Sequence, residues 1–130
     1  MKSKLHFADR SPHGWWIASF IEQAVWDDEP NPSVRSRCVA WENTVILKAA
    51  DREAAYEKAR RIGSEHESEF DNGKGRTGRW KFLGLTSLLP IYEELEDGAE
   101  VIWREHVETV GRVKSRVRRK RDLEVFRRGR

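Results

Sequence analysis

The chain has 130 residues, of which 38% are hydrophobic and 36% charged, and its net charge is +3. This length fits one domain with a single core, and six Trp exclude a disordered chain, because disordered segments are poor in large aromatic residues. No apolar run reaches the roughly 18 residues that a membrane span needs, and residues 1–10 lack the apolar segment of a secretory signal.

The N-terminal part predicts an arm followed by a strand. Residues 1–14 are polar and contain turn-forming Pro and Gly, so we expect a flexible arm there. Residues 15–26 are rich in aromatic and β-branched side chains, which favour a pleated surface. Neither of their two alternating sets is cleanly polar, which predicts a central strand that is covered on both sides for part of its length.

A second strand and a helix are predicted next. Residues 38–48 alternate with period two and should form a hairpin with the first strand across a long, Pro-containing loop. Asp51 suits the N-cap of a helix, because its carboxylate can accept a backbone N–H of the first turn. Gly63 suits a left-handed C-terminal cap of the same helix.

The remaining elements up to residue 107 form a second hairpin, a short helix and a last strand in this interpretation. Residues 65–70 and 79–85 are predicted strands, and the Asp-Asn-Gly-Lys-Gly sequence at 71–75 is a strong turn signal between them. Residues 88–95 predict a short helix with a proline in its first turn. Residues 99–107 alternate between apolar and charged side chains, which predicts a half-buried strand.

These elements together predict a single α+β domain over residues 15–109. Its sheet should be mostly antiparallel, with about five strands in the order ββαββαβ and the helices on one face, because hairpins dominate the pattern. The side chains that we expect to be mostly buried are Trp41, Val45, Leu47, Ala55, Ala59, Ile62, Phe82, Val101 and Trp103.

Several short motifs in this order resemble a known family. They are Trp41-Glu42-Asn43, the helical stretch 54–59 with Gly63, the Trp-Lys-Phe-Leu-Gly-Leu sequence at 80–85, Leu88, and the Leu-Glu-Asp-Gly-Ala-Glu sequence at 95–100. The series resembles a bacterial family catalogued as domain of unknown function 4288, over about residues 15–106. The resemblance implies a bacterial, cytoplasmic protein and carries over no activity, cofactor or catalytic residue.

The candidate functional residues within the domain are Trp41, Glu42 and Asn43. Glu42 lies in an otherwise apolar strand, and a buried carboxylate needs a partner or a raised pKa. It is therefore either a functional group or one member of a structural pair, for example with Lys81 or Arg104. The sequence suggests no catalytic set, no metal site and no cofactor. The single cysteine, Cys38, cannot form an internal disulfide, which fits the reducing cytoplasm.

The C-terminal segment, residues 110–130, is a basic tail or helix. Residues 112–130 contain ten Lys or Arg and two Asp or Glu, a net charge of +8, whereas residues 1–111 have a net charge of −5. Such a density of cations can neutralise phosphates without sequence preference, or the tail can move freely or fold back on the acidic body. The candidate nucleic-acid-binding residues are Arg112, Lys114, Arg116, Arg118, Arg119, Lys120 and Arg121.

Three functions are compatible with this sequence. The first is a non-enzymatic module that binds a protein partner through its acidic body, as a component of a bacterial toxin-neutralising or defence system would. The second is a nucleic-acid-associated protein that binds through its tail. The third, ranked last, is an enzyme centred on Glu42 and a histidine. The sequence does not indicate an oligomeric state.

Overall fold

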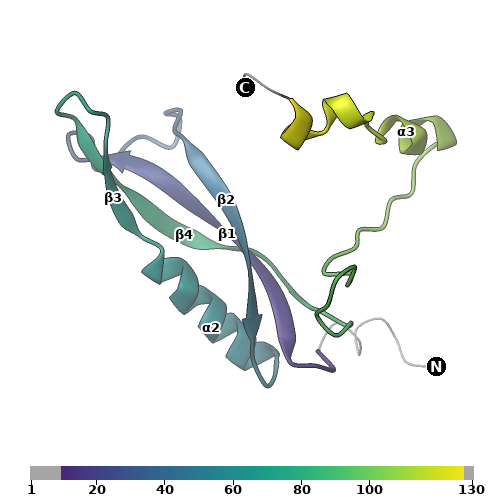
Figure 1. The fold of residues 1–130 in the computed structure, drawn as a ribbon. Coiled ribbons are helices and arrows are strands. Elements are labelled where there is room, and N and C mark those ends of the chain that lie inside the picture. Colours follow the sequence, from purple (N-terminus) through teal and green to yellow (C-terminus); the bar gives the residue numbers. More distant parts are fainter. Residues whose placement is uncertain (1–9, 128–130) are drawn as a thin grey trace.

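The computed structural model describes residues 10–127 and contains one four-stranded antiparallel sheet with a long helix on one face (Figure 1). The elements are β1 (Trp15–Trp26), β2 (Ala40–Lys48), α2 (Arg52–Glu65), β3 (Ser68–Asp71), β4 (Thr77–Pro90), α3 (Val110–Ser115) and two 3-10 turns at Lys120–Asp122 and Glu124–Phe126. The α+β class is confirmed. Most of the predicted arm, residues 1–9, lies outside the described residues.

The sheet has the order β2-β1-β4-β3, with β1 in the middle. Both predicted hairpins are present: β1 pairs with β2, and β3 pairs with β4 across the tight turn predicted at 71–75. Side chains alternate between the two faces of a strand. The even-numbered residues of β1 and the odd-numbered residues of β2 face α2, and we call this side of the sheet the helix side and the opposite side the open side.

Helix α2 lies close to the helix side because its inner stripe consists of small residues. Ala55, Ala59 and Gly63 recur every four residues and are buried. Asp51 caps the first turn as predicted, accepting a hydrogen bond of 2.8 Å from the N–H of Ala54. Gly63 is not the predicted C-terminal cap: it lies inside the helix, where a Cβ atom would collide with the ring of Phe82. The glycine is therefore needed for close approach, not for a left-handed conformation.

The core is centred on β1. Trp16, Ala18 and Phe20 are buried on the helix side, and the indole N–H of Trp16 donates a 3.1 Å hydrogen bond to the carbonyl of Ala49. Ile17 is buried on the open side, so the strand is covered on both sides at this end, as predicted. Of the nine predicted core residues, Leu47, Ala55 and Ala59 are buried and Val45, Ile62 and Phe82 are half-buried, whereas Trp41, Val101 and Trp103 are exposed.

The helix predicted at 88–95 is wrong, because β4 continues through Pro90. The N–H of Ile91 donates to the carbonyl of Trp15, so residues 15 and 91 form a hydrogen-bonded pair. Since such pairs alternate along an antiparallel ladder, the neighbouring pair of Trp16 and Pro90 is not hydrogen-bonded. The nitrogen of Pro90 therefore points away from β1, and its missing N–H removes no bond from the sheet.

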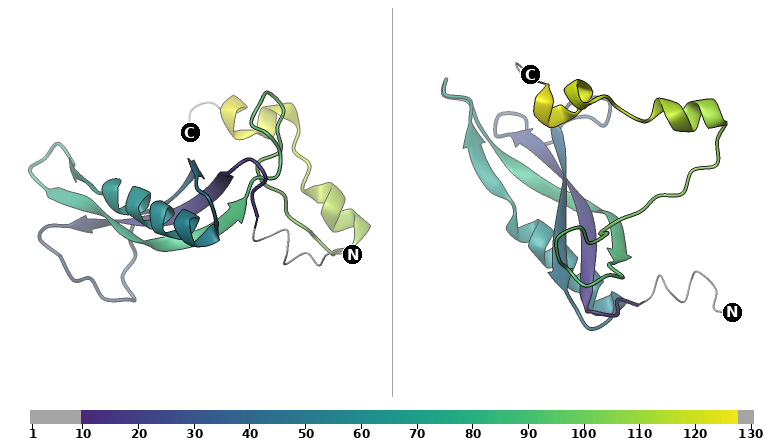
Figure 2. Two further views of the ribbon diagram at one scale, coloured as in Figure 1. Left: turned by 90° about the horizontal axis from the view of Figure 1, so that it is seen from below. Right: turned by 45° about the vertical axis from the view of Figure 1, so that its right-hand side comes forward.

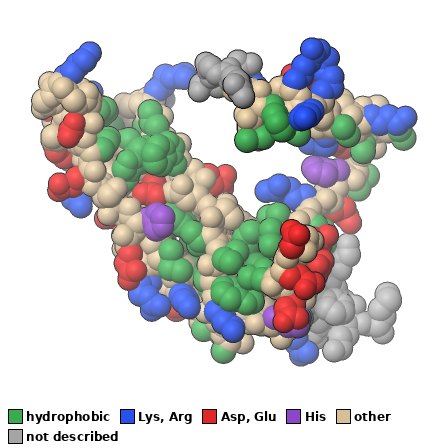
Figure 3. All heavy atoms as spheres, viewed as in Figure 1, with side chains coloured by type: hydrophobic (Ala, Val, Ile, Leu, Met, Phe, Trp, Pro, Cys, Tyr) green, Lys and Arg blue, Asp and Glu red, His purple; other side chains and the backbone are tan. Residues whose placement is uncertain are grey.

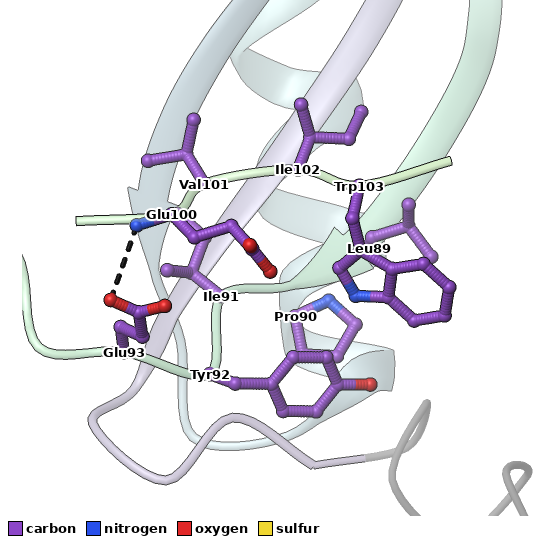
Figure 4. Close-up of a pocket in the computed structure, with 9 residues that line it drawn as sticks. All are labelled: Leu89, Pro90, Ile91, Tyr92, Glu93, Glu100, Val101, Ile102 and Trp103. Atoms are coloured by element: carbon purple, nitrogen blue, oxygen red, sulfur yellow. Dashed lines mark hydrogen bonds between the residues drawn. The ribbon is translucent and has the colours of Figure 1, made fainter. Parts of the chain in front are cut away.

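The strand predicted at 99–107 is also wrong, and the sheet has four strands instead of five. Glu100 to Trp103 instead cross the end of β4 and form a pocket of about 220 Å³ with Leu89, Pro90, Ile91 and Tyr92 (Figure 4). The N–H of Glu100 donates to the carboxylate of Glu93 at 3.3 Å. This packing does not follow the alternation, because Val101, Trp103 and Val107 are exposed and Ile102 between them is half-buried.

The tail stands apart from the sheet. In Figure 1, α3 and the two 3-10 turns lie away from the four strands and α2, and Figure 2 gives two further views of the tail. Thr109 caps α3 by accepting from the N–H of Arg112, and the helix has only six residues. Between residues 10 and 127, no helix combines the length and the apolar character that crossing a membrane requires.

Candidate functional site

Four aromatic side chains line the helix side of the sheet beyond the end of α2. Trp41 of β2 stacks on Trp80 of β4, with ring centroids 4.1 Å apart, and Phe70 of β3 follows at 5.5 Å from Trp80 and 5.0 Å from Trp26 of β1. We call this row the aromatic face. Trp41 is 55% exposed. Figure 3 shows hydrophobic side chains gathered at the end of the sheet near β3.

The aromatic face exists because the helix is shorter than the sheet. α2 ends at Glu65, so it covers only the half of the sheet that contains the core. Within the described residues, no helix covers the half of the sheet that carries the aromatic face. There the four aromatic rings pack against one another instead. Gly78 allows this packing: a Cβ atom there would lie 2.5 Å from the ring of Phe70 and 2.6 Å from the carbonyl of Val25.

An arginine closes the far end of the aromatic face. The guanidinium of Arg76 lies 4.0 Å from the ring centroid of Trp26, a cation–π distance. The same guanidinium donates hydrogen bonds of 3.0 and 2.9 Å to the two carboxylate oxygens of Asp28. These bonds hold the pKa of Asp28 below its usual value and raise the pKa of Arg76. The loop after β1 is thereby tied to the hairpin of β3 and β4.

The near end of the aromatic face meets a buried carboxylate. Glu22 of β1, paired with Trp41 in the sheet register, is only 4% exposed. Asn43 donates its side-chain amide to Glu22 Oε1, and Nδ1 of His66 lies 3.7 Å from the same oxygen. The ring of His66 also packs edge-on against Phe20, with 5.3 Å between centroids. Burial of a carboxylate is costly unless it is hydrogen-bonded, and the amide of Asn43 supplies that bond.

We call Glu22, Asn43 and His66 the Glu22 group, and it links three elements of the fold. Glu22 lies on the central strand, Asn43 on the edge strand, and His66 is the C-cap of α2. The carboxylate of Glu22 therefore has a hydrogen-bond donor within the protein, the side-chain amide of Asn43. No set of three or more His, Cys, Asp or Glu suited to a metal ion occurs among residues 10–127. The geometry therefore supports a positioning role for Glu22, which fixes the boundary between the core and the aromatic face.

The structure separates the three predicted site residues. Trp41 and Asn43 lie on the helix side and take part in the aromatic face and the Glu22 group. Glu42 lies on the open side, is exposed, and accepts a 2.6 Å hydrogen bond from the hydroxyl of Thr86. The expected partner, a cation such as Lys81 or Arg104, is replaced by this hydroxyl. Glu42 and His66 are on opposite sides of the sheet, so the proposed Glu42–histidine pair does not form with His66.

Sequence reasoning missed Glu22, and a signal for it was present. Glu22 is the one charged residue among the even-numbered positions of β1, between Phe20 and Ala24. Its burial depends on the register with β4, which shifts between Ile21 and Glu22 and again between Ser19 and Phe20. Such bulges bend a strand and redirect side chains, and the sequence does not reveal them.

We expect Glu22→Ala to destabilise the fold more than Glu42→Ala does. Removing Glu22 leaves the amide of the half-buried Asn43 without its acceptor, which costs about 1–3 kcal/mol of unfolding free energy. Glu42 is exposed and bonded to a hydroxyl that can turn to water, so its loss should cost about 0.5 kcal/mol or less. Urea unfolding of both variants measures the difference, and equal losses would contradict the positioning role.

The predicted nucleic-acid-binding residues of the tail are exposed on and after α3. Two of them form ion pairs with residues nearby in the chain: Arg116 contacts Glu108 at 2.5 Å, and Arg119 contacts Asp122 at 3.0 Å. Arg118 donates to the carbonyl of Ser115 at 3.0 Å. The structure thus places these cations together on a segment that lies apart from the sheet in Figure 1.

The fold and these surfaces define a small α+β protein with a half-open antiparallel sheet. The family model described as Domain of unknown function (DUF4288) matches residues 15–103, and the chain belongs to this family. The matched range includes all four strands, α2, the aromatic face and the Glu22 group, and excludes the basic tail. Comparisons with curated proteins and with solved structures gave no match.

Proposed function

We propose that this protein is a non-enzymatic binding module whose aromatic face receives a protein partner. The observation that carries the proposal is Trp41, which remains 55% exposed although it is stacked on Trp80. Exposed aromatic clusters mark interaction sites, and Trp is enriched among the residues that dominate binding energy. Because the rings are already packed against one another, little side-chain entropy is lost on binding.

The charge of the body favours a basic partner segment. Residues 1–111 have a net charge of −5, and a cation that reaches the exposed face of the Trp41 ring gains cation–π energy. In its narrower form the proposal is that the protein neutralises a basic partner in a bacterial toxin-neutralising or defence system, in the cytoplasm. The family match supports neither this narrower role nor any competing one.

Peptide selection against the full-length protein tests the proposal. Random peptides displayed on phage are selected for binding, and the recovered peptides are synthesised and titrated. We expect these peptides to contain Lys or Arg and to bind Trp41→Ala about 30-fold more weakly than wild type, the typical effect of removing a central aromatic contact.

The matched control is Trp103→Ala. Trp103 is 53% exposed, almost the same as Trp41, but it lies at the pocket beyond the end of β4. Its replacement should leave peptide affinity unchanged. Equal affinity of the Trp41→Ala variant and wild type for every selected peptide would exclude the aromatic face as the binding site.

The position of the tail favours nucleic-acid association as a second candidate function. In Figure 1, α3 and the 3-10 turns stand clear of the four strands, which supports a tail that is not folded back on the acidic body. The ring of Phe126 beside the ammonium of Lys120, 5.1 Å from its centroid, adds an aromatic group to the cations. Phosphates can therefore approach the tail without first displacing it.

A further inference from the structure

The two edges of the sheet differ in how they are protected. β3, at one edge, is only four residues long, and the N–H of Phe82 on the neighbouring β4 is bonded to the carboxylate of Glu67 at 2.9 Å. β2, at the other edge, is nine residues long, pairs with β1 in continuous register and contains no proline or bulge. At its end the carbonyl of Lys48 accepts a 2.8 Å hydrogen bond from the ammonium of Lys58 of α2, which a second strand would have to displace. Long unprotected edges are rare in proteins that remain alone, because they pair with other strands.

The backbone of β2 presents a regular set of hydrogen-bonding groups at this edge. The N–H of Ala24 donates to Val39, and the N–H of Ala49 donates to Gly14, both at 2.9 Å. These bonds extend the β1–β2 register and show that odd-numbered residues of β2 direct their backbone groups toward β1. The N–H and C=O groups of the even-numbered Ala40, Glu42, Thr44 and Ile46 therefore point away from the sheet.

Both sides of β2 leave room for another strand. α2 lies mainly over β4, and in Figure 1 it is displaced from β2 toward β3. On the helix side Val45 is half-buried and Trp41 exposed, and on the open side Ile46 is 47% exposed. Apolar side chains on both faces of an edge strand would gain burial from a neighbour.

We propose that β2 pairs antiparallel with β2 of a second copy, which joins the two sheets across a twofold axis at Val45. In this register Thr44 lies opposite Ile46 of the other copy, and both residues direct their backbone groups across the interface. Glu42 then lies opposite Lys48 of the other copy, twice per dimer. On the helix side Val45 faces Val45, and Asn43 faces Leu47.

Charge complementarity selects this occupant over an unrelated strand. Glu42 and Lys48 are the only charged side chains of β2, and this arrangement of the strand with itself places them opposite each other. To meet across the interface, Glu42 turns from the hydroxyl of Thr86 and Lys48 from the ring of Trp15. Opposite charges across a strand pair stabilise it, and like charges directly opposite destabilise it. Trp41 of the aromatic face belongs to β2 and lies opposite Ala49 of the other copy in this register, whereas Trp80, Phe70 and Trp26 lie on other strands. The dimer rests on the backbone and the charges of β2, so it does not depend on the proposed peptide-binding function.

Charge reversal tests the register. In Glu42→Lys, two lysines face each other at each of the two positions, and in Lys48→Glu, two glutamates do. Each single variant should dimerise about tenfold more weakly than wild type in sedimentation velocity, measured from low micromolar to submillimolar concentration. An equimolar mixture of the two variants restores opposite charges at both positions and should regain the wild-type affinity.

Two further measurements make the result unambiguous. Glu29→Lys, the same charge change on the loop after β1, is the control and should dimerise like wild type. Amide exchange of the wild-type protein gives a second readout that does not depend on any variant being folded. The N–H groups of Thr44 and Ile46 should become protected as concentration rises, whereas those of Asn43 and Val45 should be protected at every concentration.

Three outcomes would overturn the proposal. A wild-type protein that sediments as a monomer throughout the concentration range excludes the dimer. Dimers without concentration-dependent protection of Thr44 and Ile46 form through another surface. Failure of the mixed variants to recover affinity, with both folded by circular dichroism, excludes the twofold axis at Val45.

Discussion

Replacing Trp16 with Ala should lower the unfolding free energy by about 3–5 kcal/mol, the usual cost of removing a buried Trp or Phe. Trp16 is 1% exposed, lies on the central strand and packs against Ala18, Leu47 and the Ala-rich stripe of α2. Its indole N–H also donates to Ala49, so truncation removes both packing and a hydrogen bond. Such a loss is a large share of the roughly 5–15 kcal/mol that stabilises a typical small domain.

Trp103→Ala is the matched control, and urea unfolding monitored by circular dichroism is the measurement. Trp103 is 53% exposed, so its truncation returns much less apolar area to water and should cost less than half as much as that of Trp16. Equal losses would mean that the segment after residue 99 belongs to the core, as the sequence pattern suggested. A loss below about 1 kcal/mol for Trp16→Ala would contradict the placement of the core.

The second large effect is expected from salt. We expect the full-length protein to bind duplex DNA weakly and without sequence preference through the basic tail. If about six of its cations contact phosphates, the logarithm of the affinity falls with the logarithm of salt concentration at a slope of about −5, so affinity drops about a thousandfold between roughly 50 and 200 mM salt. Titration of fluorescent DNA across a salt series measures this slope.

A protein truncated after Gly111 is the first control and should not bind, because its net charge is −5. A full-length variant with Gln at the seven candidate positions keeps the tail and removes only the charge, so it should also lose binding. The variant changes Arg112, Lys114, Arg116, Arg118, Arg119, Lys120 and Arg121. Equal binding by all three proteins, or no binding by the full-length protein at low salt, would exclude nucleic-acid association through the tail.

Local patterns in the sequence correctly predicted the elements that depend on near neighbours. The strand at 15–26, the N-cap at Asp51 and the turn at 71–75 were predicted and are present. Each depends on residues adjacent in the chain: a run of β-formers, a carboxylate beside a first turn, or glycines that accept positive φ. The antiparallel α+β class followed from these elements, because short connections join antiparallel strands.

Two elements were predicted wrongly, the helix at 88–95 and the strand at 99–107, because their structure depends on strands that are distant in the sequence. Pro90 lies in β4 because its nitrogen faces away from β1, and only the register with Trp15 and Trp16 determines that direction. Residues 99–107 alternate like a strand, but Glu100 to Trp103 pack against the end of β4 as an irregular segment. Pattern alone does not indicate which sheet edge, if any, is available to an alternating segment.

The candidate site shows the same division. The sequence by itself determined the excess of tryptophan, the acidic body with its basic tail, and the alternation that puts Trp41 and Asn43 on one side of a strand and Glu42 on the other. Only the tertiary structure decided that α2 ends before it reaches Trp41, which leaves the aromatic face open, and that Glu22 is buried beside Asn43 and His66. The physical reason is that burial depends on which element covers a residue, and that coverage is set by helix length, bulges and strand order across the whole fold.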